Sequence, residues 1–165
     1  MSRQVVPGRY AAMLGSLVVL HFTVPELVGE QRVAPDFLLL ALILYAVQAR
    51  PGSAAIAGFV VGIVADSLTP AAFGAGALAY TLVGYLTAWG KAVFFAENVA
   101  VTAGIIFLGV WVRDLIVLAA GRPPNDAALL WQLGLWSPLK ALTTLVAGVL
   151  VLALVRRSLR GRVAG

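Results

Sequence analysis

Charged side chains inside or beside long apolar stretches are the residues of this sequence most able to do chemistry. Arg113 and Asp114 interrupt one apolar stretch, Lys140 lies near the start of another, and Asp66 lies at the end of a third. A charge at mid-bilayer costs about 2.5–3.5 kcal/mol on insertion scales, so such residues usually pair or reach toward the headgroups. We predict one intramembrane polar cluster, formed by Asp66, Arg113, Asp114 and Lys140. The alternative is that the two basic side chains reach the interface separately.

The remaining polar residues are too few for catalysis or transport along a polar path. The predicted inner half of the bundle offers only His21, Thr102 and scattered hydroxyls, which is too sparse for a proton or ion relay. With one histidine and no cysteine, a multi-histidine metal site and thiol chemistry are both excluded within one chain. No nucleophile motif, phosphate-binding loop or pair of carboxylates on one helix is present. We therefore expect neither an enzyme nor a cofactor.

Composition indicates which solvent surrounds most of the chain. Of its 165 residues, 61% are hydrophobic and only 12% are charged, and the mean hydropathy is +0.97. A soluble domain is typically about 25% charged and about 45–50% apolar, so one small core could not hide this much apolar surface. The net charge of +5 does not indicate nucleic acid, because most basic residues lie at short connections and chain ends. The sequence predicts an all-α integral membrane protein.

Six apolar stretches, separated by charged and turn-forming residues, predict six transmembrane helices in one domain covering residues 1–165. The second opens with the pair Pro35-Asp36, a favourable helix start. The second and third are short, because a full crossing needs about 20 residues. Two short crossings in thinned lipid still cost less than a re-entrant hairpin that would place Arg50 deep in the membrane. The predicted spans are about 10–28, 36–48, 54–67, 71–89, 98–120 and 138–155.

The distribution of charge predicts the orientation. Placing the N-terminus in the cytoplasm puts most basic residues inside, as the positive-inside rule requires. An even number of crossings returns the C-terminus to the cytoplasm as well. The inner side then receives Arg3, Arg9, Arg50, Lys91, Arg156, Arg157, Arg160 and Arg162, whereas the outer side receives only Arg32 and Arg122 among basic residues.

The connection between the fifth and sixth spans contains a second apolar segment. Residues 127–136 carry Trp131 and Trp136, and tryptophan is favoured at the membrane interface. The segment therefore predicts either a helix lying on the outer surface or an extension of the sixth span beyond a kink at Pro138.

Small residues recur at helical spacing on the third and fourth spans. Such spacing clears one face of a helix, so that another helix backbone can approach closely. The partner in that contact is either a neighbouring helix of the same chain or the transmembrane helix of another protein. The residues concerned are Gly58, Gly62, Asp66, Gly76 and Gly84.

The region from Pro35 to Leu86 resembles the MreD family of bacterial rod shape-determining membrane proteins. Elsewhere the resemblance lies mainly in length and in the six-span plan. The resemblance implies a fold similar to the substrate-binding S-components of energy-coupling-factor transporters, and family-like polar positions at Pro35, Asp36 and Asp66. The segments that carry it are PDFLLLALILY (35–45), RPG (50–52), AGFVVGIVAD (57–66), LTPAAFGAGAL (68–78) and VGYL (83–86).

The resemblance implies a non-enzymatic subunit of the elongation machinery in the bacterial cytoplasmic membrane, supporting side-wall peptidoglycan synthesis and rod shape. The expected partners are MreC, the synthase RodA with its class B penicillin-binding protein (directly or through MreC), MreB, and membrane lipids. The alternative function is a solute-binding S-component of a vitamin transporter. That function would favour three successive small residues on the first helix, and Leu20 interrupts the series of Ala12 and Ser16.

Overall fold

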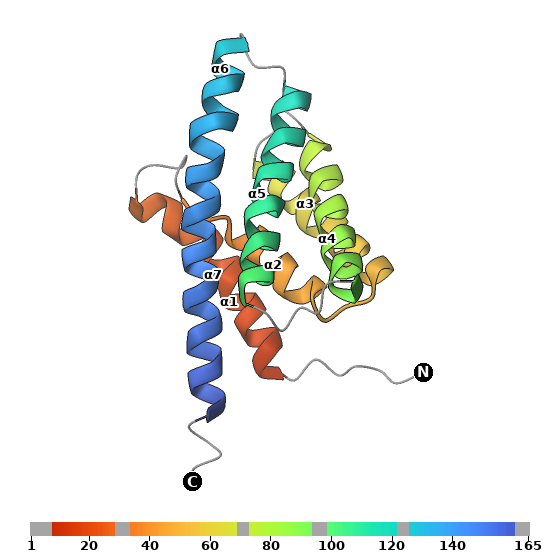
Figure 1. The fold of residues 1–165 in the computed structure, drawn as a ribbon, viewed down its shortest axis with the longest axis vertical. Helices are drawn as coiled ribbons and strands as arrows, with labels where there is room; N and C mark the ends of the chain where they lie inside the picture. Colours follow the sequence, from red (N-terminus) through yellow and green to blue (C-terminus); the bar gives the residue numbers. More distant parts are fainter. Residues whose placement is uncertain (1–7, 29–33, 69–72, 94–98, 122–125, 161–165) are drawn as a thin grey trace.

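The computed structural model describes residues 8–28, 34–68, 73–93, 99–121 and 126–160, and the secondary structure of this part of the chain is all helical (Figure 1). The last three helical segments follow one another without a break, so six helical rods are described. The elements are α1 (Gly8–Val28), α2 (Phe37–Ala46), α3 (Pro51–Leu68), α4 (Ala75–Val93), α5 (Val99–Gly121), α6 (Asp126–Trp131), η2 (Gln132–Trp136) and α7 (Ser137–Arg160).

The helices lie where the sequence has its apolar stretches. The fourth begins at Ala75 rather than at residue 71, because Gly74 adopts a left-handed φ of 95° that does not continue a helix. Two segments, Val101–Gly121 and Leu129–Val151, are long and apolar enough to cross a membrane, with mean hydropathies of 2.0 and 1.4. Three shorter apolar helical segments accompany them, Ala12–Val24, Phe37–Ala46 and Pro51–Ser67. The architecture is consistent with a helical membrane protein.

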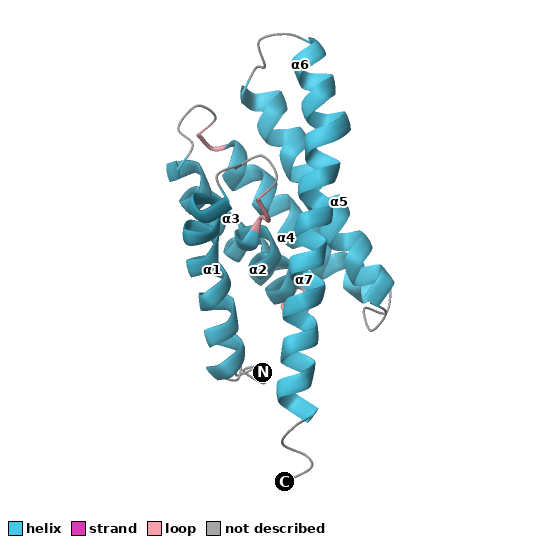
Figure 2. Ribbon diagram, turned by 90° about the vertical axis from the view of Figure 1, so that its left-hand side faces the viewer, coloured by secondary structure: helices cyan, strands magenta, loops and turns pink. Residues whose placement is uncertain are grey.

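The short helix α2 forms the core of the bundle. Every residue from Phe37 to Leu44 is buried, and α2 contacts α1, α3, α4, α5 and α7 (Figures 1 and 2). A helix that is apolar all round has no polar stripe to present to solvent and is therefore buried on every side. The shortness of this stretch thus reflects its place inside the bundle.

Helices α3 and α4 make the closest pair, and glycines allow it. A Cβ atom on Gly58 would overlap the Tyr80 carbonyl oxygen, and one on Gly62 would lie 2.5 Å from Ala77 Cα. A Cβ on Gly84 would lie 2.6 Å from the Ala54 carbonyl oxygen. These glycines therefore pack inside the chain. Of the two partners that the sequence left open for these three glycines, a neighbouring helix of the same chain is the one that they contact.

The segment after α5 extends the last helix. Helices α6, η2 and α7 form one continuous rod from Asp126 to Arg160, about 50 Å long at 1.5 Å per residue (Figure 2). A separate helix on the membrane surface is therefore not what the structure contains. Close to Pro138, where the sequence predicted a kink, the rod has a widened turn of π-helix over Gln132–Trp136.

Pro138 accounts for the widened turn. In this turn the Ser137 backbone N–H donates to the Gln132 carbonyl, five residues back. With the same five-residue spacing, residue 138 would donate its backbone N–H to the Leu133 carbonyl. Residue 138 is a proline and has no N–H, so the Leu133 carbonyl has no backbone donor at this position. The Trp111 indole N–H of α5 donates to this carbonyl at 3.2 Å instead. A tryptophan from the neighbouring helix thus compensates for the proline.

Replacing Trp111 with phenylalanine should lower stability by about 1–3 kcal/mol, because the Leu133 carbonyl would be left without a donor. In a Pro138→Ala background the same change should cost less, since alanine supplies the backbone N–H that proline lacks. The measurement is the melting temperature in detergent of four proteins: the wild type, Trp111→Phe, Pro138→Ala and the double variant. The difference between the loss in the double variant and the sum of the single losses gives the coupling between Trp111 and Pro138. Strictly additive losses would contradict this account of the turn.

Candidate functional site

Asp36 lies at the start of α2 and is almost completely buried, at 1% exposure. Its carboxylate accepts a hydrogen bond from the Leu39 backbone N–H at 3.0 Å, which caps the helix. Its own backbone N–H donates to the Thr144 hydroxyl of α7 at 3.0 Å. The Pro35-Asp36 pair predicted a helix start, and the structure places that start in the interior of the bundle.

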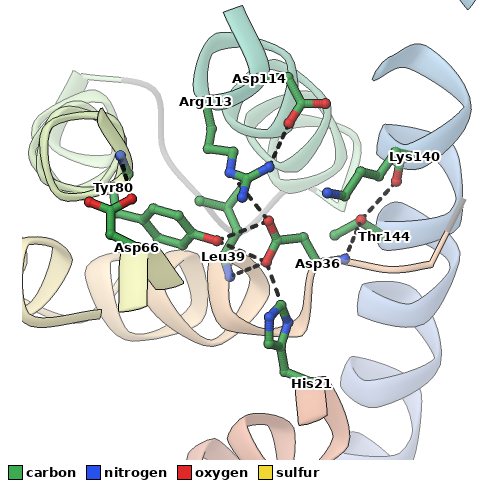
Figure 3. A network of polar contacts seen from close by, with 10 residues as sticks. His21, Asp36, Leu39, Asp66, Tyr80, Arg113, Asp114, Lys140 and Thr144 are labelled. Atoms are coloured by element: carbon green, nitrogen blue, oxygen red, sulfur yellow. Dashed lines mark hydrogen bonds and ion pairs between the residues drawn. The ribbon is translucent and has the colours of Figure 1, made fainter. Parts of the chain in front are cut away.

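Three further side chains surround the Asp36 carboxylate (Figure 3). The Tyr80 hydroxyl of α4 donates to Asp36 at 3.0 Å from Oδ2 and 3.1 Å from Oδ1. Arg113 Nε of α5 lies 3.7 Å from Oδ2, and His21 Nδ1 of α1 lies 3.8 Å from Oδ1. The guanidinium carbon of Arg113 also lies 5.6 Å from the centre of the Tyr80 ring, within the range of a cation–π contact.

The network continues through Arg113 to a second carboxylate. Arg113 Nη1 donates to Asp114 Oδ1 at 2.7 Å, the length of a charge-assisted hydrogen bond. Lys140 extends from α7 toward Asp36 (Figure 3), but no carboxylate oxygen of the described residues lies within 4.0 Å of its ammonium nitrogen. We call this set the Asp36 network; its members are His21, Asp36, Tyr80, Arg113, Asp114, Lys140 and Thr144.

Asp66 does not belong to this network, which corrects the predicted cluster of four charged residues. Its two carboxylate oxygens accept backbone hydrogen bonds from Gly74, Gly76 and Ala77, each at 2.9 Å. The first turn of a helix has N–H groups with no partner inside the helix, and Asp66 faces the first turn of α4. A Cβ on Gly76 would overlap Asp66 Oδ1, so this glycine makes the approach possible.

Asp66→Asn should destabilise the protein by about 1–2 kcal/mol, because an amide replaces one of the acceptor oxygens at the α4 start. Ser67→Ala is the matched control: Ser67 lies next in sequence, is exposed, and its hydroxyl donates to the Ile63 carbonyl of its own helix. The control should change stability by less than about 0.5 kcal/mol. Equal melting temperatures for the two variants would contradict the capping role.

Sequence reasoning found Arg113, Asp114 and Lys140 but missed the carboxylate at the centre of the network. The sequence identifies Asp36 as a helix start and, together with Pro35, as a family-like polar position. In the structure the Pro35 carbonyl accepts a hydrogen bond from the Phe37 N–H at 3.1 Å. A carboxylate that directly precedes a run of eleven apolar residues, Phe37 to Val47, is the signal that could have identified it. Nothing in the sequence around Tyr80 indicates a polar partner, because Tyr80 lies among small residues on α4.

The polar contacts of the Asp36 network connect helices to one another. The Asp36 network joins α2 to α1, α4, α5 and α7, and the charges of its two aspartates are balanced by Arg113 and Lys140. No group of three or more potential metal ligands occurs among the described residues. The arrangement holds the helices of the bundle together.

An all-helical bundle with long apolar helices and a buried, almost entirely apolar central helix is consistent with a helical membrane protein. The family model for rod shape-determining protein MreD matches residues 8–156, so this chain belongs to the MreD family. Membership implies a role in determining rod cell shape, and the family is not a known enzyme family. Neither a curated protein nor a solved structure matches the chain.

Proposed function

We propose that this protein is a non-enzymatic scaffold of the elongation machinery that binds the transmembrane helix of MreC. Through MreC, or directly, it supports RodA and its class B penicillin-binding partner, alongside MreB. The observation that carries the proposal is the family match over residues 8–156. The same match favours this function over that of a vitamin-transporter S-component. The Asp36 network supports a structural role, because its charged groups are directed at one another inside the bundle.

We further propose that the chain forms one domain that crosses the cytoplasmic membrane six times with both ends inside. Six helical rods are described, and an even number of crossings places both ends on one side. The basic residues near the C-terminus of α7 and at the α2–α3 connection then face the cytoplasm. The short central helix α2 agrees with the S-component-like fold, with some short helices, that the family resemblance implies.

A groove between α4 and α5 is the surface that we assign to the MreC helix. It has a volume of about 470 Å³ and an almost entirely apolar lining that includes Gly90, Gly104 and Leu108. Among the described residues, no atom of another part of the chain lies within 4 Å of a Cβ placed on Gly90 or Gly104, in contrast to the glycines between α3 and α4. Because lipid already solvates apolar side chains, helices associate in membranes through close packing at small residues. The groove offers such residues without an internal partner.

Gly104→Leu should reduce the recovery of MreC with this protein about fivefold or more, because the leucine fills the groove. A fivefold loss corresponds to about 1 kcal/mol. The measurement is the ratio of MreC to bait after affinity purification from mild detergent. Gly15→Leu on α1 is the matched control, since its Cβ also meets nothing within 4 Å and it lies outside the groove. Unchanged MreC recovery with Gly104→Leu would contradict the assignment of the groove.

A further inference from the structure

The Asp36 network and its surroundings contain buried polar atoms that the described residues leave without a hydrogen-bond partner. Three of its surrounding atoms are buried and have no hydrogen-bond partner among the described residues: His21 Nδ1, Arg113 Nε and Ser137 Oγ. Buried polar atoms nearly always have a partner in the protein or in ordered water. The three atoms come from α1, α5 and α7, which all contribute to the network.

The separations from the Asp36 carboxylate to Arg113 and to His21 are too long for direct hydrogen bonds. Arg113 Nε lies 3.7 Å and His21 Nδ1 lies 3.8 Å from the two different oxygens of the carboxylate. A nitrogen–oxygen hydrogen bond is about 2.7–3.2 Å long, and a polar contact beyond about 3.5 Å raises the question of a bridging water. The Lys140 ammonium has three donors, and no carboxylate oxygen of the described residues lies within 4.0 Å.

Ser137 differs from other helical hydroxyls in this chain. The hydroxyls of Ser67, Thr81 and Thr144 each donate to the carbonyl four residues back. For Ser137 that carbonyl belongs to Leu133, which already accepts the Trp111 indole N–H. Ser137 is completely buried and lies two helical turns from Thr144, on the same face of α7. Because Thr144 bonds the Asp36 backbone, this face of α7 is the one turned toward the network.

We propose that ordered water molecules occupy the Asp36 network and bridge its donors to the two carboxylates. Water fits the network better than an anion does, because the formal charges of Asp36 and Asp114 are already balanced by those of Arg113 and Lys140. A further anion would leave an uncompensated charge inside the bundle, which is costly. Water supplies two acceptor sites and two donors without adding charge, and buried waters commonly bind about three polar groups. The Asp36 network therefore holds water among its polar side chains inside the bundle.

Water-edited solid-state NMR of the full chain in phosphatidylethanolamine–phosphatidylglycerol bilayers tests this inference. The sequence is favourable, because His21 is the only histidine and Lys91→Arg leaves Lys140 as the only lysine. Transfer of magnetisation from water to the His21 imidazole and the Lys140 ammonium should be about tenfold faster than to the backbone amide of Ile43, which is fully buried in α2. Transfer to both side chains as slow as to Ile43 would overturn the proposal.

A second measurement distinguishes water from an anion. Addition of inorganic phosphate should leave the Lys140 and His21 signals unchanged if water is the occupant. A saturable shift of either signal with phosphate would assign the site to an oxyanion and overturn the assignment to water. Both measurements are made on protein whose fold is verified by the remaining spectrum, so neither depends on a variant of the network.

Discussion

Asp36→Asn is expected to lower the melting temperature of the detergent-solubilised protein by on the order of 10 °C, more than any other single polar substitution. Asp36 caps α2, accepts from Tyr80 and lies opposite Arg113. Removing one partner of a buried ion pair typically costs about 3–5 kcal/mol, because the other charge remains buried and uncompensated. Asparagine keeps the size of the side chain and one acceptor oxygen, so the loss would report the charge.

A double-mutant cycle checks that the loss arises at Arg113. Arg113→Gln alone should also destabilise the protein, whereas the double variant should lose much less than the sum, since neither charge is then left alone. Asp66→Asn provides the control, because it belongs to the α4 cap and its loss should add to that of Asp36→Asn. Additive losses for Asp36 and Arg113 would show that the two residues do not interact.

Gly58→Leu and Gly62→Leu are expected to abolish the folded bundle. A Cβ on either residue would already meet the backbone of α4 at 2.9 Å or less, at Thr81 Cα for Gly58 and at Ala77 for Gly62. Overpacking typically costs about 1–3 kcal/mol when side chains can move aside, and here the obstacle is the backbone of the neighbouring helix. The two helices would have to separate along their length.

The measurement is the fraction of monodisperse protein by fluorescence-detected size-exclusion chromatography. Gly104→Leu is the matched control, because it adds the same side chain at a helical glycine with nothing within 4 Å of its Cβ. The control should give a wild-type profile, and Gly62→Leu should give aggregate or no protein. A well-folded Gly62→Leu variant that had lost only MreC would restore the docking interpretation of the α3 face.

Local patterns in the sequence predicted the elements of the fold well. Apolar runs placed the helices, and the pair Pro35-Asp36 marked the start of α2. Charged residues within apolar stretches predicted a polar cluster that includes Arg113, Asp114 and Lys140, and in the structure Arg113 Nη1 lies 2.7 Å from Asp114 Oδ1. Small residues on α3 and α4 indicated close packing of helices, and two of the close contacts are between Gly58 and Tyr80 and between Gly62 and Ala77.

Long-range partners were beyond what the sequence could show. Asp36 and Tyr80 are 44 positions apart, and Asp36 and Thr144 are 108 apart, so no spacing rule joins them. Asp66 was assigned to the wrong partners because its charge was considered without the unpaired N–H groups at the start of α4. The π-helical turn depends on Pro138 and on Trp111 from another helix, which hydropathy alone does not connect.

Photo-crosslinking in growing rod-shaped cells tests most directly whether this protein acts as a scaffold for MreC through the α4–α5 groove. A photoreactive amino acid would replace Leu108, which lines the groove and is 59% exposed. Ile56 on α3, at 69% exposure, is the comparison on a face outside the groove. A crosslink to MreC from position 108 and none from position 56 is the predicted result. A crosslink to MreC from position 56 alone, or from neither, would contradict the account.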